Sequence, residues 1–267
     1  MGWSERQRLM LAEMGLSVWV PDATEEMAVV ADAPRPTPAP GPAPARAAPV
    51  ATGAPRDPQS ATPAVPVDHP ASTATSPVAA LDWPALREAV AACRACGLCE
   101  GRRNTVFGVG NERAHLMVVG EAPGEQEDRK GEPFVGPAGQ LLDSMLRALN
   151  LTRDPGPPER QVFIANTLKC RPPGNRNPEP EELARCEPFL QRQLALVQPR
   201  VILAMGRFAV QALLRSGEPI GRLRGRVHQY QGVPLVVTYH PAYLLRNLPD
   251  KAKAWEDLCL AAQILSD

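Results

Sequence analysis

The residues from Leu116 to Asp143 constrain the fold of this chain more than any other stretch. They open with an apolar run, LMVV, that is typical of a buried strand. The sequence GEAPG follows with two glycines and a proline, so the backbone must turn sharply there. After a charged loop and a second glycine-bearing turn, apolar residues recur at helical spacing from Gln140 to Leu149. Open α/β sheets build sites at the carboxyl ends of their strands from this combination of strand, glycine turn, carboxylates and helix.

Apolar runs alternate with helical segments through the rest of the chain. Such alternation predicts an α/β fold with a mostly parallel central sheet, right-handed crossovers and helices on both faces. The expected strands are Val162–Ala165, Val201–Ala204, and a hairpin of Arg226–Tyr230 with Val233–Thr238 around Gly232; the expected helices are Trp83–Ala95, Glu179–Val197, a segment from Gly206 through Leu214, and Lys251–Leu265.

Glu121, Asn166 and His240 each follow the carboxyl end of an expected strand. Because the carboxyl ends of parallel strands meet at one edge of a sheet, the three side chains can share one crevice. Asn166 offers both a donor and an acceptor, which suits the edge of a base or an amide. His240 either donates a hydrogen bond to a developing anion or caps a turn. This convergence is the main functional signal in the sequence.

The glycine-rich stretch itself carries groups with two interpretations. The carboxylates of Glu121, Glu127 and Asp128 can orient water or stabilise positive charge, but loop carboxylates are more often simply solvated. Phe134 can stack on a planar ligand or plug the core, and the residues alone favour the core.

Cysteines form a second signal. Cys93, Cys96 and Cys99 are closely spaced, Cys170 ends the run VFIANTLKC, and Cys186 lies in an expected helix. Disulfides are rare in cytosolic enzymes, whereas metal thiolate sites are common there. A four-cysteine set can hold zinc or an iron–sulfur cluster, and the spacing alone does not separate the two.

Composition divides the chain. Residues 33–80 consist mainly of Pro, Ala, Thr and Ser without an aromatic residue, so they bury too little apolar surface to fold. We predict a disordered Pro/Ala-rich linker at residues 23–80 and a folded domain at residues 81–267. From Trp83 onward, 24 Lys and Arg oppose 20 Asp and Glu, which gives this part a net charge of +4 in a chain of net charge zero. A mildly basic domain permits nucleic-acid binding without requiring it.

Residues 1–22 are expected to form a short amphipathic segment with too few apolar residues for a core of its own. The segment either docks onto the main domain or binds a partner protein as a helix in a groove. No apolar run is long enough to span a membrane. The start of the chain lacks a basic stretch followed by an apolar core, so we expect no secretion signal and a cytoplasmic protein.

Four motifs occur in a fixed order along the folded domain. They are GEAPGEQED (Gly120–Asp128), PFVGPAGQLLD (Pro133–Asp143), NTLKCRPPGNRNP (Asn166–Pro178) and HPAYLLR (His240–Arg246). Together they resemble the family-4 uracil-DNA glycosylases, the iron–sulfur-containing bacterial and archaeal group. The resemblance covers roughly Trp83 to the C-terminus and excludes the leader and the linker.

The resemblance implies a three-layer α/β/α sandwich and a 4Fe-4S cluster that supports the fold without a redox step. By position it implies that the cluster ligands are Cys93, Cys96, Cys170 and Cys186. Cys99 falls where the family needs no ligand and is expected to be a spare thiol, and Cys259 is expected in the core.

The resemblance also implies a DNA repair enzyme that flips uracil out of DNA and hydrolyses its N-glycosidic bond, leaving an abasic site for base excision repair. Phe134 would stack on the base, Asn166 would hydrogen-bond its polar edge, and Glu127 would exclude the methyl group of thymine. His240 would stabilise charge on the uracil oxygen, and Glu121 would position water and balance positive charge on the sugar.

DNA contacts are expected from two sets of residues. Leu244, Leu245 and Arg246 would enter the duplex as a wedge and contact phosphate. Basic side chains would line the phosphate path: Lys169, Arg171 and Arg176.

A non-catalytic damage-binding or replication-associated adaptor is the alternative, and the intact acidic and histidine motifs count against it. A related group crosslinks to the abasic product through a histidine, but residues 171–186 contain none, so we expect turnover. The expected enzyme is a monomer that acts on uracil-containing DNA, with residues 1–22 recruiting a replication or repair protein.

Overall fold

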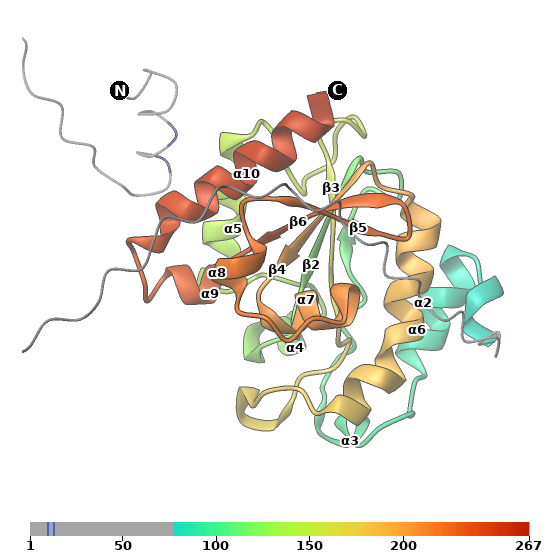
Figure 1. Ribbon diagram of the computed structural model, residues 1–267. Coiled ribbons are helices and arrows are strands. Elements are labelled where there is room, and N and C mark those ends of the chain that lie inside the picture. Colours follow the sequence, from blue (N-terminus) through green and yellow to red (C-terminus); the bar gives the residue numbers. More distant parts are fainter. Residues whose placement is uncertain (1–9, 11–12, 14–76, 267) are drawn as a thin grey trace, which may run out of the picture. The chain divides into compact units, whose positions relative to one another are not determined.

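The computed structural model describes Met10, Glu13 and residues 77–266 (Figure 1). The expected amphipathic segment at residues 1–22 and the expected linker at residues 23–80 otherwise lie outside the described residues. The last part of that linker forms a short 3-10 helix, η1 (Pro77–Ala80), and Val78 packs against the core. The domain boundary expected at residue 81 stays a prediction.

A mostly parallel sheet forms the centre of the fold, as predicted. The strand order is β1-β3-β2-β4-β6-β5, in which β3, β2, β4 and β6 run parallel and the edge strands β1 and β5 pair antiparallel. The strands are β1 (Val109–Gly110), β2 (Leu116–Gly120), β3 (Val162–Asn166), β4 (Val201–Met205), β5 (Val227–Tyr230) and β6 (Val233–Thr238). The expected hairpin of the last two strands is confirmed, whereas the two-residue β1 was not expected because it is too short to show a period.

Helices cover both faces of the sheet and confirm the expected three layers. Figure 1 shows α5 and α10 on one side and α2 and α6 on the other. The helices are α2 (Trp83–Ala91), α3 (Leu98–Gly101), α4 (Glu125–Lys130), α5 (Pro137–Ala148), α6 (Pro180–Val197), α7 (Arg207–Leu214), α8 (Ile220–Leu223), α9 (Pro241–Leu244) and α10 (Asp250–Ser266), with a second 3-10 turn η2 (Pro173–Asn175). Among the described residues, no helix combines the length and apolar character needed to cross a membrane.

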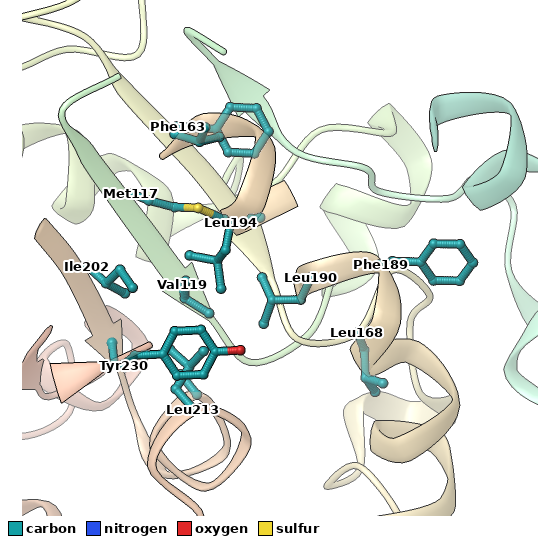
Figure 2. Packing of buried hydrophobic residues seen from close by; sticks show 14 of the residues in the cluster. Met117, Val119, Phe163, Leu168, Phe189, Leu190, Leu194, Ile202, Leu213 and Tyr230 are labelled. Atoms are coloured by element: carbon teal, nitrogen blue, oxygen red, sulfur yellow. The ribbon is translucent and has the colours of Figure 1, made fainter. Parts of the chain in front are cut away.

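The sheet separates two hydrophobic clusters, because alternate side chains of each buried strand point to opposite faces. In β2, Met117 and Val119 face the cluster that contains α6, while Leu116 and Val118 face the cluster that contains α5 and α10. Figure 2 shows the first cluster, with Met117 and Val119 near leucines of α6. Since both faces are covered, β2 reads as a continuous apolar run.

One helix boundary and one expected loop differ from the expectations. The helix expected to reach Ala95 ends at Ala91, because the Cys93 N–H bonds to the Val90 carbonyl at 3.2 Å and the chain turns there. The expected charged loop after Gly124 is the helix α4. Its acidic residues lie in the first turn and its basic residues in the last, so both ends complement the helix dipole, and Gly131 ends the helix at φ 76°.

Candidate functional site

A cavity of about 200 Å³ lies at the carboxyl ends of β2, β3 and β6. The structure brings together the five residues that were expected to bind the base and carry the chemistry. They are Glu121, Glu127, Phe134, Asn166 and His240. The strand register explains the meeting, because Gly120 pairs with Asn166 across β2 and β3, so both strands end at the same level.

Gly120 allows an aromatic ring and an amide to approach each other at the floor of the cavity. A Cβ at this position would lie 2.5 Å from Asn166 Oδ1 and 2.7 Å from Phe134 Cζ. Phe134 is held in turn by Gly139, where a Cβ would lie 1.7 Å from the Phe134 carbonyl oxygen. Phe134 is 6% exposed and packs in the core, as the residues alone favoured, and it also lines the cavity; its stacking on a planar ligand stays a prediction.

Asn166 Oδ1 is a buried acceptor without a hydrogen-bond partner among the described residues. An unsatisfied buried acceptor costs free energy, so it is normally explained by a ligand or a water molecule. The position at the end of β3 aims this amide at the cavity. The site thus presents an unused acceptor to a molecule that carries an N–H donor.

Glu127 has both carboxylate oxygens occupied by main-chain donors. Oε1 accepts from the N–H groups of Val135 at 3.0 Å and Gly136 at 3.1 Å, and Oε2 accepts from Gly124 at 3.1 Å. The side chain therefore ties the start of α4 to the turn that follows Phe134. Because three bonds fix it, Glu127 presents a rigid wall to the cavity.

His240 is held as a neutral hydrogen-bond donor. It caps α9, and its Nδ1 accepts from the Ala242 N–H at 3.1 Å, which leaves the proton of a neutral ring on Nε2. Burial and the charge of Arg246 lower the pKa of His240 to about 4, against the opposing effect of Glu127. The ring lies 5.5 Å from the Phe134 ring between centroids. A neutral imidazole can donate to an oxygen that gains charge in this cavity.

Glu121 is a further titratable group of the cavity, beside Glu127 and His240. Burial raises its pKa above the usual range, and the positive charge of Arg207 opposes the rise. Arg176 also lines the cavity, where its guanidinium pairs with Glu182 at 2.6 Å. A carboxylate and a guanidinium therefore both line the cavity.

A separate cavity is lined by cysteines. The five that line it are Cys93, Cys96, Cys99, Cys170 and Cys186. Arg102 Nη1 donates to Cys170 Sγ at 3.1 Å, and the Lys169 N–H donates to Cys186 Sγ at 3.3 Å. In the described part of the chain, no group of three or more His, Cys, Asp or Glu residues is placed to hold a metal ion.

Comparisons with known proteins identify the family. The model of the Uracil DNA glycosylase superfamily matches residues 107–259, which contain all five residues of the first cavity. The chain belongs to this superfamily. The Type-4 uracil-DNA glycosylase of Archaeoglobus fulgidus is 44% identical over 164 residues, which is 58% of this chain and 79% of that protein. The Type-4 enzyme of Sulfurisphaera tokodaii is 42% identical over 181 residues, 64% of this chain and 79% of that protein.

The type within the superfamily also agrees with the sequence motifs. A Type-5 uracil-DNA glycosylase of Pyrobaculum aerophilum is 34% identical over 149 residues, 52% of this chain and 66% of that protein. The Type-4 relatives match at higher identity over longer stretches. The resemblance to the family-4 enzymes is therefore confirmed.

Two of the residues expected to contact DNA need correction, Leu244 and Lys169. Leu244 is fully buried within the core, so it is not available as a wedge in this structure. The cause is the packing of α9 against α5, which directs Leu244 into the hydrophobic cluster that contains α5 and α10. Leu245 and Arg246 are exposed, and so is Leu248, at 54%. In the sequence, the only sign of Leu248 as an exposed apolar residue near this segment is that it is the third leucine in the run LLRNL.

Lys169 was expected along the phosphate path, and that expectation is wrong. Its side chain is 2% exposed, so no phosphate reaches it in this structure. Burial lowers the pKa of its ammonium to about 8. Arg171 remains partly exposed and donates to Asn175 Oδ1 at 2.8 Å.

Proposed function

We propose that this protein is a DNA repair glycosylase that binds a uracil flipped out of DNA and hydrolyses its N-glycosidic bond, leaving an abasic site. One observation carries the proposal: the buried Asn166 acceptor has no partner among the described residues and lies beside an aromatic ring and a neutral histidine in one cavity. A flipped base is recognised by hydrogen bonds to its polar edge and by stacking on aromatic side chains. The family membership of the chain agrees with this chemistry.

Base recognition would use Asn166 and Phe134 together. Uracil carries an N–H donor between two carbonyl groups, and this donor would satisfy Asn166 Oδ1. Phe134 would cover the face of the base. Glu127 would reject thymine, because the methyl group of thymine needs space that a side chain fixed by three hydrogen bonds does not yield.

His240 would act on the leaving base. Breaking the N-glycosidic bond places negative charge on uracil, and the Nε2 proton of a neutral His240 would bind the oxygen that gains it. A single donor of this kind lowers the barrier by about 2.7–4 kcal/mol. Glu121 would act on the other side of the bond, by positioning water and by balancing positive charge on the sugar.

DNA would be held around the mouth of the cavity. Leu245 is 42% exposed on the segment that follows His240, where it can enter the duplex as the uracil leaves it. Arg246 is exposed beside it and would contact phosphate.

A 4Fe-4S cluster would be held by Cys93, Cys96, Cys170 and Cys186. As they stand, these thiols are not placed to hold a metal ion in the described part of the chain, and the support is their donor chemistry: they line one cavity, and two of them accept hydrogen bonds from a guanidinium and a main-chain N–H. The cluster would supply a crosslink between the segment after α2, the segment after β3 and α6. The proposed reaction transfers no electrons, so the cluster has no part in its steps.

An alkali cleavage assay tests the proposed function. The full-length protein, with its iron content measured, is incubated with duplexes that contain one uracil or one thymine at the same position. We expect strand breaks at uracil alone, and we expect the His240→Ala variant to lose them. If the iron-loaded wild type leaves no abasic site, the residues serve binding without hydrolysis and the proposal is overturned.

A further inference from the structure

We propose that Lys169 is a positioning residue that fixes Asn166 for recognition of the base. The proposal rests on the proposed function, since it assigns a role in that same site. Lys169 lines the cysteine cavity and is not part of the base cavity, so it does not touch the base. It acts through the main chain at the end of β3.

The contacts of Lys169 form a buried polar chain. Its Nζ donates to the Asn166 carbonyl oxygen at 2.8 Å and to Gln193 Oε1 at 2.6 Å. Gln193 is fully buried in α6, and its Nε2 donates to the Phe107 carbonyl oxygen at 2.9 Å. The end of β3 is thereby linked through side chains to a helix and to a segment outside the sheet.

A lysine in this place needs a reason, because burying an amine is costly unless its hydrogen bonds are made. An apolar side chain of similar length would fill the same volume at lower cost. Such a side chain would leave the Asn166 carbonyl without the donor that Lys169 provides. The structure therefore uses the long side chain to hold one main-chain oxygen at the point where β3 ends.

That oxygen matters because the Asn166 side chain is not anchored at its acceptor. Asn166 Oδ1 has no partner within the described residues, so the direction of the amide depends on the backbone that carries it. The backbone is held on one side by pairing with Gly120 of β2 and on the other by Lys169. Removing the ammonium would allow the strand end, and the amide with it, to shift.

The main chain of Lys169 is held independently of its side chain. Its N–H donates to Cys186 Sγ at 3.3 Å, and its carbonyl oxygen accepts from the Val106 N–H at 2.8 Å. A change of the side chain leaves both bonds in place. The cysteine cavity should therefore survive a substitution that disturbs base recognition.

A double-mutant cycle tests the proposal with the full-length protein. The variants are Lys169→Met, Asn166→Ala and the two combined, and kcat/KM for uracil excision is measured for each. We expect Lys169→Met alone to lower kcat/KM by about 10- to 100-fold through misplacement of the amide. In the Asn166→Ala background the same change should have no further effect, because a residue that acts through Asn166 has nothing left to position. Lys169→Arg, which keeps a donor, should restore part of the loss.

The iron content of each variant separates this role from a purely structural one. Lys169→Met should keep the iron content of the wild type. Losses that multiply in the double variant, or iron lost together with activity, would overturn the proposal. If Lys169→Met does not fold, Gln193→Leu takes its place in the cycle, because it removes the second contact of the Lys169 ammonium. A loss of kcat/KM from Gln193→Leu that persists in the Asn166→Ala background again counts against the proposal. An inactive wild type would instead refute the proposed function.

Discussion

Replacing His240 by alanine tests whether a neutral histidine stabilises the leaving uracil. The substitution removes the Nε2 donor from the cavity and the Nδ1 acceptor from the start of α9. His115→Ala is the matched control, because His115 precedes β2 at the opposite end of the strand from the cavity. Both variants lose one imidazole, and only one of them loses it from the proposed site.

The magnitude follows from the environment of the ring. With the pKa of His240 at about 4, about one molecule in a thousand carries an imidazolium at pH 7. The active form is then the neutral donor, whose removal should lower the rate by about 10²- to 10³-fold. Because the folded-state pKa lies below the usual 6.5, the unfolded chain binds the proton more tightly. Stability is therefore lost as the pH falls from about 6.5 toward 4, which sets the lower limit of the assay.

The assay is single-turnover excision from a duplex with one uracil, because product release then does not mask the chemical step. The rate is measured between about pH 5 and pH 8. The ratio of wild-type to His240→Ala rates should stay constant across this range, because the protonation state of His240 does not change within it. His115→Ala should match the wild type throughout.

A ratio that rises as the pH falls through about 6.5 would refute the argument. It would mean that an imidazolium, with an ordinary histidine pKa, performs the stabilisation. Equal rates for His240→Ala and the wild type would remove the residue from the reaction altogether.

Three further predictions concern other parts of the site. Gly120→Ala should weaken base binding by at least about tenfold, because its Cβ would lie 2.5 Å from Asn166 Oδ1. The control Gly217→Ala, whose Cβ would meet nothing within 4 Å, should match the wild type in kcat/KM. Equal kcat/KM for Gly120→Ala and the wild type would refute the close packing. Cys186→Ser should abolish iron binding by the purified protein and Cys99→Ser should not, and iron lost from Cys99→Ser would make that thiol a ligand. Glu127→Ala should release the three main-chain bonds of the wall and allow excision of thymine in the alkali assay, and a variant that still rejects thymine would argue against exclusion by this side chain.

The sequence predicted which residues meet at the site better than it predicted whether individual side chains are buried or exposed. Glu121, Asn166 and His240 could be placed together because each follows an apolar run, and parallel strands end at one edge. The burial of Leu244 depends on the phase of a short helix that the motif does not reveal. Lys169 looked like a surface cation, since nothing near it in the sequence shows that Gln193 lies beside its ammonium.

The helix α4 shows a different reason for error. A run of acidic and basic residues between glycines is typical of a solvated loop, and its apolar content gives no helical period. The order of the charges was informative, because Glu125 and Glu127 in the first turn and Arg129 in the last turn complement the helix dipole. Glu127 then belongs to a rigid helix start, which is what allows a carboxylate to serve as a wall.

The base cavity and the cysteine cavity share one short segment of chain, and this bears on the role of a cluster. Asn166 lies in the first cavity and Cys170 in the second. Between them, the Thr167 and Leu168 N–H groups bond to the carbonyls of Gly120 and Glu121 at 3.0 and 3.1 Å. Because few residues separate Asn166 and Cys170 and both N–H groups are engaged, a displacement at Cys170 would be carried along the main chain toward Asn166, whereas the Lys169 ammonium acts on the Asn166 carbonyl directly. A cluster bound to Cys170 would therefore act on base recognition through the position of the main chain, and it would need no electron transfer to do so.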